Sequence, residues 1–502
     1  MSNILIGWSE KDVSTDKPVN IPGQFHMRIS RGIMDPLTCT ALVLRSGGSS
    51  AIFLSVDLVV IRCGLYNEVM AKVAEKNPCI PSDKILMNAT HTHTGASHYY
   101  FEGMGHFSGS SAGGIGGKEN VELPHEMEIA SSDEYREFLA DRCADAICEA
   151  WDSASEGGIA WGYGYAVVSH SRRPCYSDGK GGTYAKMYGD TNDENFLGYE
   201  AGADHFTNML YTFDAGGNLT GAIVNVPCPS QCSENEYMLS ADYWHNTRSE
   251  IKKRHGEHIH ILAQCAAGGD LSPRILHYKE AQKRRMRLKY GDTDYTNSTK
   301  ALCERADIAE RIADSFDEVL SWARKDIRTE AVVRHETREF MLTRRIPTEA
   351  EYNAAKAELE RLGDLVLKTD GTPIENLKFN SKEKTLRARQ ARVVTNYENK
   401  DDSKLPMKAH IIRIGDIAFA SNRFELYMDF QHRIQARSPF EQTFIVQLAA
   451  VPGDEGGTYL ATARGVDNKS YSACIFDNAC SPEGGQELVE QTLEVLDELA
   501  KD

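Results

Sequence analysis

KILMNATHTHTG, residues 84–95, decides how the rest of the sequence is interpreted. Its first seven residues are mainly apolar and predict a buried strand that ends at two histidines. Because residues two apart on a strand point to the same face, His91 and His93 are expected to project together, and Gly95 permits a tight exit. Such a pair can bind a metal, or one imidazole can bind it while the other handles a proton. In isolation, the same pattern is more often a pair of hydrogen-bonded surface histidines.

The sequence around this motif predicts a mixture of strands and helices. Two apolar runs, residues 40–46 and 49–61, are separated by a Gly-Gly-Ser turn, and a helix is expected over 66–77. Hairpins are expected over 205–226 and 408–422. Further helices are expected over 131–154, 303–325, 347–363 and 486–502, and one beginning near Phe424. The predicted fold class is α/β, with a mixed β-sheet core flanked by helices.

One large domain with an insertion accounts for this order of elements. Residues 1–330 are expected to form its main part and residues 406–502 its C-terminal part. Residues 331–405, which are helical, polar and rich in lysine towards their end, are expected to form an insertion. The glycine- and serine-rich segment 103–118 is typical of an active-site lid and equally of a surface loop.

Composition excludes several classes of partner. The 502 residues are 41% hydrophobic and 26% charged, and 73 acidic against 56 basic residues give a net charge of -17. An acidic surface repels phosphate backbones and anionic lipids, so neither nucleic acid nor a charged membrane is expected to bind. No run approaches the roughly 20 apolar residues that span a bilayer. The N-terminus lacks the pattern of a signal peptide, and the twelve cysteines form no CxxC pair, so a cytoplasmic location is expected.

Several motifs recur in the order in which one enzyme family carries them. They are ILIGWSEKDVS (4–14), FLSVDLVVI (53–61), ATHTHTG (89–95), SRRPCY (171–176), GGDLSPR (268–274), SNRFELYMDF (421–430) and GTYLATARGVDNKSY (457–471). Together they resemble the catalytic domain of the neutral, or alkaline, non-lysosomal ceramidases. The resemblance covers nearly all of that domain, and several motifs in order are far more specific than any one of them.

The resemblance implies a metal-dependent hydrolase that cleaves an amide (N-acyl) bond of a small-molecule substrate by metal-activated water. The implied ligands of zinc, or of another divalent ion, are His91, Cys228, Glu425 and Tyr459. The implied catalytic residues are His93, Ser272, Asp270, Arg172 and Tyr471. Glu425 is expected to begin a helix directly after a strand, and Ser272 to lie in a glycine-rich turn whose amides face an oxyanion. Taken alone, these two would more often be a solvated helix residue and an ordinary turn.

Cys228 marks a departure from the family, because it stands where the second ligand histidine is expected. A thiolate binds zinc well, so Cys228 could replace that histidine. Alternatively, His245 or Cys232 takes its place, or no catalytic metal is bound. The histidines of HGEHIHI, residues 255–261, cannot share one face, and this segment is interpreted as the polar start of a strand.

Two other functions stay open. One is a metal-dependent hydrolase or lyase acting on a small polar or carbohydrate-type substrate, and the other is a non-catalytic scaffold that has lost the metal. Ceramide itself is not expected. The secreted ceramidases carry a further domain after the catalytic one, whereas this sequence ends 502 − 471 = 31 residues after Tyr471, and it shows no lipid-docking patch. The sequence leaves room for a homo-oligomer.

Overall fold

Two β-sheets form the core of the chain. The computed structural model describes residues 2–99, 128–291, 297–450 and 458–501, and within these residues a ten-stranded mixed sheet lies beside a four-stranded one. The larger sheet has the order β14 (His260–Cys265), β13 (Leu219–Val226), β12 (Phe206–Asp214), β7 (Ser155–Tyr165), β1 (Ser2–Asp12), β4 (Thr38–Ser46), β5 (Ser49–Val56), β6 (Ile85–Ala89) and β22 (Ala449–Ala450), with β16 (Glu330–Ala331) paired to β1. The smaller sheet has the order β17 (Val333–Thr343), β18 (Lys404–Ile414), β19 (Ile417–Ser421) and β21 (Gln442–Val446).

The sheets pack face to face through apolar side chains. Phe53 of the larger sheet lies 4.9 Å from Phe419 of the smaller one, between ring centroids. Leu42 and Leu44 join this inner layer, while Val43 between them faces the opposite side and is also buried. Strands buried on both faces explain the continuous apolar runs of the sequence.

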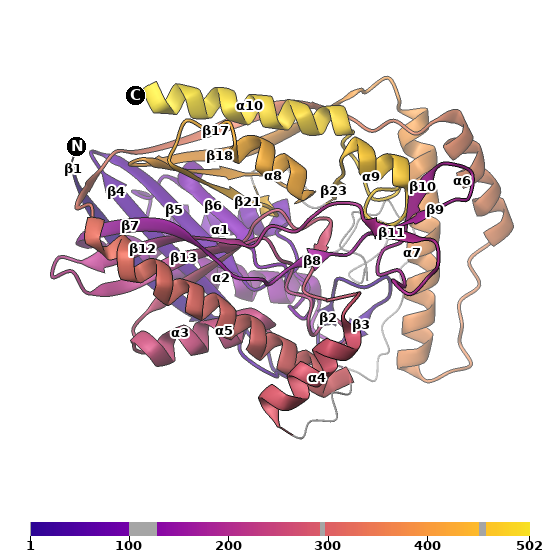
Figure 1. Cartoon of the computed structure of the whole chain (residues 1–502), viewed down its shortest axis with the longest axis horizontal. Coiled ribbons are helices and arrows are strands. Elements are labelled where there is room, and N and C mark those ends of the chain that lie inside the picture. Colours follow the sequence, from indigo (N-terminus) through magenta and orange to yellow (C-terminus); the bar gives the residue numbers. More distant parts are fainter. Residues whose placement is uncertain (1, 100–127, 292–296, 451–457, 502) are drawn as a thin grey trace.

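Helices cover the outer faces of both sheets (Figure 1). One half of the larger sheet is covered by α1 and α2, the other half by α3 and α5, and the smaller sheet by α8 and α10. Their bounds are α1 Cys63–Lys76, α2 Ser132–Asp152, α3 Tyr243–His255, α5 Asn297–Ala323, α8 Met428–Gln435 and α10 Pro482–Lys501. The fold is therefore a four-layer α/β structure, and the expected α/β class with a mixed sheet flanked by helices is confirmed.

Most predicted elements are present. The hairpin of β4 and β5 turns at Gly47 and Gly48, whose φ angles of 59° and 81° are left-handed and therefore favour glycine. The helix expected near Phe424 is wrong, because α8 begins only at Met428. Before it, Glu425 and Leu426 form β20 and pair in parallel with β23 (Tyr459–Leu460).

The expected insertion, residues 331–405, holds two helices that stand at the end of the molecule opposite to both termini (Figure 1). These are α6 (Glu349–Leu362) and α7 (Pro373–Glu398), each begun by a threonine capping box. The same range contains β17, which is a strand of the smaller sheet. The expected lid segment, residues 103–118, lies outside the described residues.

The parallel strand pairs direct several loops to one place. β6 runs parallel to β5, β14 to β13 and β21 to β19, and the loops after these strands carry the histidines, the GGDLSPR motif and Glu425. Short strands brace the same region, namely β2 (Asn20–Ile21), β3 (Arg28–Ile29), β8 (His170–Ser171), β9 (Pro174–Ser177), β10 (Thr183–Ala185), β11 (Phe196–Tyr199) and β15 (Leu271–Ser272). Two further helices are α4 (Lys279–Tyr290) and α9 (Ala463–Asn468). Carboxyl ends of parallel strands are the usual place for a ligand site in α/β folds.

A search of the described residues for membrane-spanning helices finds none that is long and apolar enough.

Candidate active site

His91 lies two residues after β6, where the backbone takes a left-handed turn. Its φ angle is 61°, a conformation that costs a non-glycine residue free energy and is common at functional sites. Its Nδ1 donates a hydrogen bond of 2.6 Å to the carbonyl oxygen of Val59. The tight exit expected at Gly95 is also present, since a Cβ there would lie 2.8 Å from the carbonyl oxygen of Asp57. The turn therefore fixes the His91 ring with its Nε2 facing away from the strand.

The Nε2 atom of His91 faces the carboxylate of Glu425 at 3.2 Å from Oε2. Both side chains are buried, with 1% and 5% of their surface exposed. His91 Nδ1 already donates to Val59, so Nε2 is the nitrogen that meets Glu425, and Glu425 Oε2 has no other hydrogen-bond partner in the described part of the chain. Two electron-rich atoms held face to face need a cation between them, either a proton or a metal ion.

The electrostatics of Glu425 favour its charged form. Burial alone would raise the pKa of this carboxyl, but His91 and Arg172 outweigh burial and hold the pKa below its usual value. The neighbouring hydroxyl of Tyr459 lowers the pKa of Glu425 further. Glu425 is therefore available as an anionic ligand at neutral pH.

His93 stands beside His91, with its Nε2 3.4 Å from the Nε2 of His91. The side-chain amide of Gln231 donates to His93 Nε2 at 2.8 Å, so this nitrogen is an acceptor as well. Burial, together with the neighbouring His91 and Arg28, holds the pKa of His93 well below its usual value. His93 is thus a neutral imidazole whose Nε2 accepts from Gln231 and lies beside the Nε2 of His91.

Two tyrosines complete this group. Tyr459 pairs with Glu425 across β20 and β23, and its hydroxyl lies 3.4 Å from the hydroxyl of Tyr471. Burial raises the pKa of both phenols above their usual value. In the protein without a metal ion, both tyrosines are therefore protonated and can donate hydrogen bonds.

Arg172 packs over the Tyr459 ring, with its guanidinium carbon 5.3 Å from the ring centroid. The GGDLSPR motif supports it from behind, because Gly269 and Asp270 accept hydrogen bonds from Arg172 through their carbonyl oxygens. A Cβ at Gly269 would lie 2.3 Å from the carbonyl oxygen of Glu425, so the motif needs glycine to approach that strand. Arg172 and Glu425 are thus held by the same loop.

Asp270 and Ser272 belong to this supporting loop. Asp270 accepts a hydrogen bond from the Met428 amide at 3.0 Å, and Ser272 Oγ accepts one from the Arg274 amide at 3.2 Å. Both side chains are buried, and burial raises the pKa of Asp270 to about 6. Among the described contacts, none joins either side chain to His91, His93 or the tyrosines.

Cys228 lies in a different environment. Its sulfur contacts the carbonyl oxygens of Val168 and Pro229 at 3.4 and 3.5 Å, inside the apolar cluster beneath α3 and α5. Burial raises the pKa of its thiol well above the usual value, as it does for Cys232 in the same cluster. His245, the other alternative, lies on α3 near Asp35. In the described part of the chain, no contact joins any of these three side chains to His91 or Glu425.

The donor atoms fit a divalent ion only in part. His91 and Glu425 supply the nitrogen and the carboxylate oxygen that zinc prefers, and the Tyr459 hydroxyl beside them supplies a third donor. The described residues hold no group of three or more His, Cys, Asp or Glu side chains with metal-binding geometry. A metal here would rest on His91, Glu425 and Tyr459.

The loop that carries Tyr471 is tightly held. Lys469, Ser470 and Ser472 have left-handed φ angles of 59°, 71° and 72°. Arg173 donates to the carbonyl oxygens of Tyr471 and Lys469 at 2.6 and 2.7 Å, and its guanidinium pairs with Glu200 at 2.6 Å. The two adjacent arginines therefore differ in position, with Arg172 beside the tyrosines and Arg173 beneath the loop.

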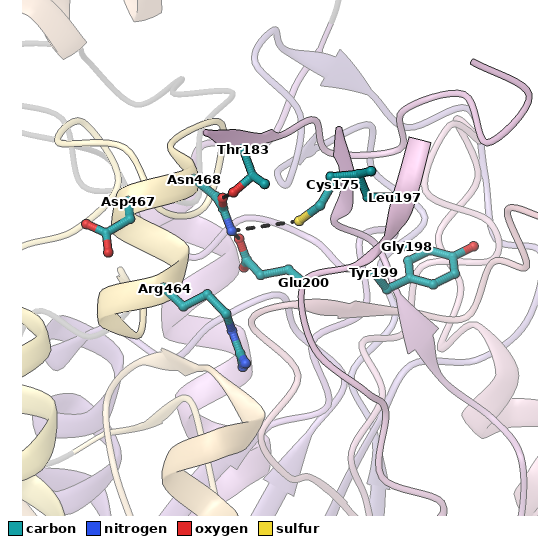
Figure 2. A pocket seen from close by; sticks show the side chains of 9 residues that line it. All are labelled: Cys175, Thr183, Leu197, Gly198, Tyr199, Glu200, Arg464, Asp467 and Asn468. Atoms are coloured by element: carbon teal, nitrogen blue, oxygen red, sulfur yellow. Dashed lines mark hydrogen bonds between the residues drawn. The ribbon is translucent and has the colours of Figure 1, made fainter. Parts of the chain in front are cut away.

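A pocket of about 450 Å³ is lined by Glu200 together with residues of β9, β10, β11 and α9 (Figure 2). Asn468 lies at its centre and bonds to Glu200 at 3.0 Å and to Thr183 at 2.6 Å. Its lining includes none of the histidines or tyrosines described above. This pocket therefore borders the Tyr471 loop and is separate from the candidate site.

Sequence reasoning missed two residues of the site. Gln231, which orients His93, lies three positions after Cys228, inside the segment singled out for a different reason. Tyr188 has a left-handed φ of 54°, and its hydroxyl reaches Gln231 Oε1 at 3.5 Å. No pattern in the sequence predicts a left-handed conformation for this tyrosine.

Comparison with known structures identifies the fold. No protein-family model matches the sequence, and a search of curated proteins finds no match. The neutral ceramidase from Pseudomonas aeruginosa matches with a TM-score of 0.68 and 17% sequence identity, over 100% of this chain and 75% of that one. A structure described as ceramidase complexed with C2 matches with a TM-score of 0.65 and 16% identity, over 100% of this chain and 76% of that one. The chain therefore has the neutral ceramidase fold, and at that level the resemblance carried by its motifs is confirmed.

Proposed function

We propose that this protein is a hydrolase that cleaves an amide (N-acyl) bond at the site formed by His91, His93, Glu425, Tyr459 and Tyr471. The observation that carries the proposal is the buried meeting of His91 Nε2 and Glu425 Oε2 at 3.2 Å, with two tyrosine hydroxyls beside them. These residues come from loops more than 300 positions apart in the sequence, and the fold that unites them is that of the neutral ceramidases.

The side chains can divide the work of amide hydrolysis. Water adds its hydroxyl to the acyl carbon, the carbon–nitrogen bond breaks, and the remaining proton of the water goes to the departing amine. His93 would accept a proton at Nε2 from the attacking water, in place of the hydrogen bond that Gln231 donates to that nitrogen. The protonated hydroxyls of Tyr459 and Tyr471 would donate to the carbonyl oxygen as it gains charge, or to the amine nitrogen as it leaves.

We further propose that zinc, or another divalent ion, is held by His91, Glu425 and Tyr459. The buried approach of His91 Nε2 and Glu425 Oε2 at 3.2 Å supports this, because a metal ion can take the place of a proton shared between these two atoms. When bound there, such an ion supplies Lewis acidity and lowers the pKa of water. Cys228 is left out of the ligand set, because its sulfur lies in the apolar cluster under α3.

The cytoplasm is the proposed compartment. Eight of the twelve cysteines are buried, and the described part of the chain shows no disulfide among them, which fits a reducing environment.

Product analysis tests the proposal. Purified protein is incubated with a set of N-acyl compounds, and free fatty acid and free amine are measured together. Equimolar release that disappears in Glu425→Gln, with cooperative unfolding retained, is the expected result. Release that persists in Glu425→Gln would place the chemistry elsewhere.

A further inference from the structure

Three buried arginines in the described part of the chain are matched by carboxylates. Guanidinium groups that are 0–6% exposed pair with carboxylate oxygens at 2.6 or 2.7 Å in Arg173–Glu200, Arg248–Asp57 and Arg305–Asp35. Arg28 pairs with no carboxylate in the described part of the chain, but it donates to four backbone carbonyl oxygens. Such compensation is expected, since a buried charge without a partner is costly.

Arg172 has less compensation than these arginines. It is 2% exposed, and within the described residues it has no carboxylate at ion-pair distance. Its side chain makes one hydrogen bond there, from Nη2 to the carbonyl oxygen of Gly269 at 2.7 Å, while Nε has no acceptor. Most of the donor capacity of this guanidinium is therefore unused.

The unused donors lie beside the reacting groups. The guanidinium carbon is 5.3 Å from the Tyr459 ring centroid, and Tyr459 in turn pairs with Glu425 across β20 and β23. The groups that act on Arg172 electrostatically are Tyr459, Tyr188, Glu425 and Tyr471. A ligand atom that reached these donors would therefore lie within a few bonds of the amide being cleaved.

The surroundings add positive charge, although the whole chain is acidic. Arg28 and Arg274 both act on His93 together with Arg172. Arg274 is already paired with Glu234, and Arg28 with carbonyl oxygens, so neither is free for a ligand. Among the described residues of this group, Arg172 is therefore the arginine whose donors can bind a ligand. A single guanidinium with a planar fork of donors matches one carboxylate in charge and shape, whereas a phosphate dianion would leave excess charge.

We propose that the substrate is an N-acyl amino acid, whose carboxylate lies next to the scissile amide and accepts hydrogen bonds from Arg172. This rests on the proposed amide hydrolysis and names the substrate class for the same site. It differs from a neutral lipid amide in the charge beside the bond that is cleaved.

A matched pair of compounds tests the carboxylate directly. N-octanoylglycine and its neutral isostere N-octanoylglycinamide differ in that group alone. The wild-type protein should cleave the acid with a kcat/KM about 10- to 100-fold above that of the amide, the range expected for charge-assisted hydrogen bonds. Arg172→Gln should abolish this preference, because kcat/KM for the acid should fall about 10-fold or more beyond any fall in kcat/KM for the glycinamide, and Arg172→Lys should restore part of the preference. Arg437→Gln, which alters an exposed arginine paired with Glu490, is the matched control and should keep the wild-type preference.

Three results would overturn the proposal. Equal cleavage of acid and glycinamide by the wild type shows that no carboxylate is recognised. An equal loss on both compounds in Arg172→Gln shows that Arg172 acts on the amide itself. If Arg172→Gln does not fold, Arg172→Lys is used instead. A preference of Arg172→Lys for the acid over the glycinamide that equals the wild-type preference would then overturn the proposal.

A binding measurement distinguishes failure of this inference from failure of the proposed function. If neither compound is cleaved, the amide hydrolysis fails, and thermal shifts with the same two compounds then decide the carboxylate. A shift with N-octanoylglycine that is absent with the glycinamide and absent in Arg172→Gln supports the anion site. Equal shifts, or none, overturn it.

Discussion

Replacing Arg173 by methionine should damage both the stability and the activity of the protein. Arg173 and Glu200 are buried, with 0% and 2% of their side chains exposed, and their ion pair is 2.6 Å long. Removing one partner of such a pair leaves an uncompensated buried charge, which costs about 3–5 kcal/mol. The free energy of unfolding should therefore fall by about that amount in a urea titration. Adding Glu200→Gln should restore part of it, because the stranded carboxylate is then neutral.

The effect on activity follows from the Tyr471 loop. Without Arg173, the carbonyl oxygens of Tyr471 and Lys469 lose their donor, and the left-handed residues of the loop lose this restraint. The Tyr471 hydroxyl should then leave its place 3.4 Å from Tyr459. A displacement of about 1 Å at a reacting group can lower kcat about 100-fold. We therefore expect kcat to fall about 10- to 100-fold at a temperature where the variant is fully folded.

Arg305→Met is the matched control. It breaks the Arg305–Asp35 pair, which is equally short at 2.6 Å and whose described contacts include no residue of the Tyr471 loop. Both variants should lose similar stability, but Arg305→Met should keep kcat within about 3-fold of the wild type. Equal losses of kcat in the two variants would show that Arg173 acts through stability alone and would refute this reasoning.

Three further predictions concern the candidate site. His91→Ala and Glu425→Ala should each abolish activity and lower bound metal, measured by elemental analysis, while cooperative unfolding is retained; loss of that cooperativity would make them structural residues. Cys228→Ala should leave metal content unchanged and cost about 1 kcal/mol of stability, because its sulfur packs in an apolar cluster, whereas loss of metal would show that the thiol reaches the ion. Burial raises the pKa of Asp270 to about 6 from the usual 3.8, so its contribution to stability is full below pH 3.8 and is lost as pH rises through 6. Asp270→Asn should therefore be more stable than the wild type at pH 7, by at most about 3 kcal/mol, and urea titrations that show the same pH dependence in both proteins would contradict this.

Much of the fold could be predicted because its strands are buried on both faces. Residues 40–61 form an apolar hairpin around two glycines, and that pattern is visible without any tertiary information. The helix predicted at Phe424 failed because β20 is only two residues long and owes its conformation to pairing with β23, 459 − 425 = 34 positions later. A pairing that short leaves no periodic signal.

The candidate site was predictable where motifs carried it. His91, His93, Glu425, Tyr459, Tyr471 and Arg172 are brought together by loops whose order follows the family motifs. Local sequence says nothing about which way a side chain turns, and Cys228 points into an apolar cluster while Gln231, three residues later, bonds to His93. Tyr188 could not be identified either, because its local sequence does not predict a left-handed backbone conformation.

Cleavage of N-octanoylglycine in water enriched in oxygen-18 tests the central claim most directly. Hydrolysis places one oxygen from water into the released octanoic acid and yields an equal amount of glycine. We predict octanoic acid that is 2 mass units heavier, formed by the wild-type protein and absent in Glu425→Gln. Cleavage without incorporation of the label would indicate a lyase, and no cleavage of this or any other N-acyl compound would contradict the assignment of an amide hydrolase.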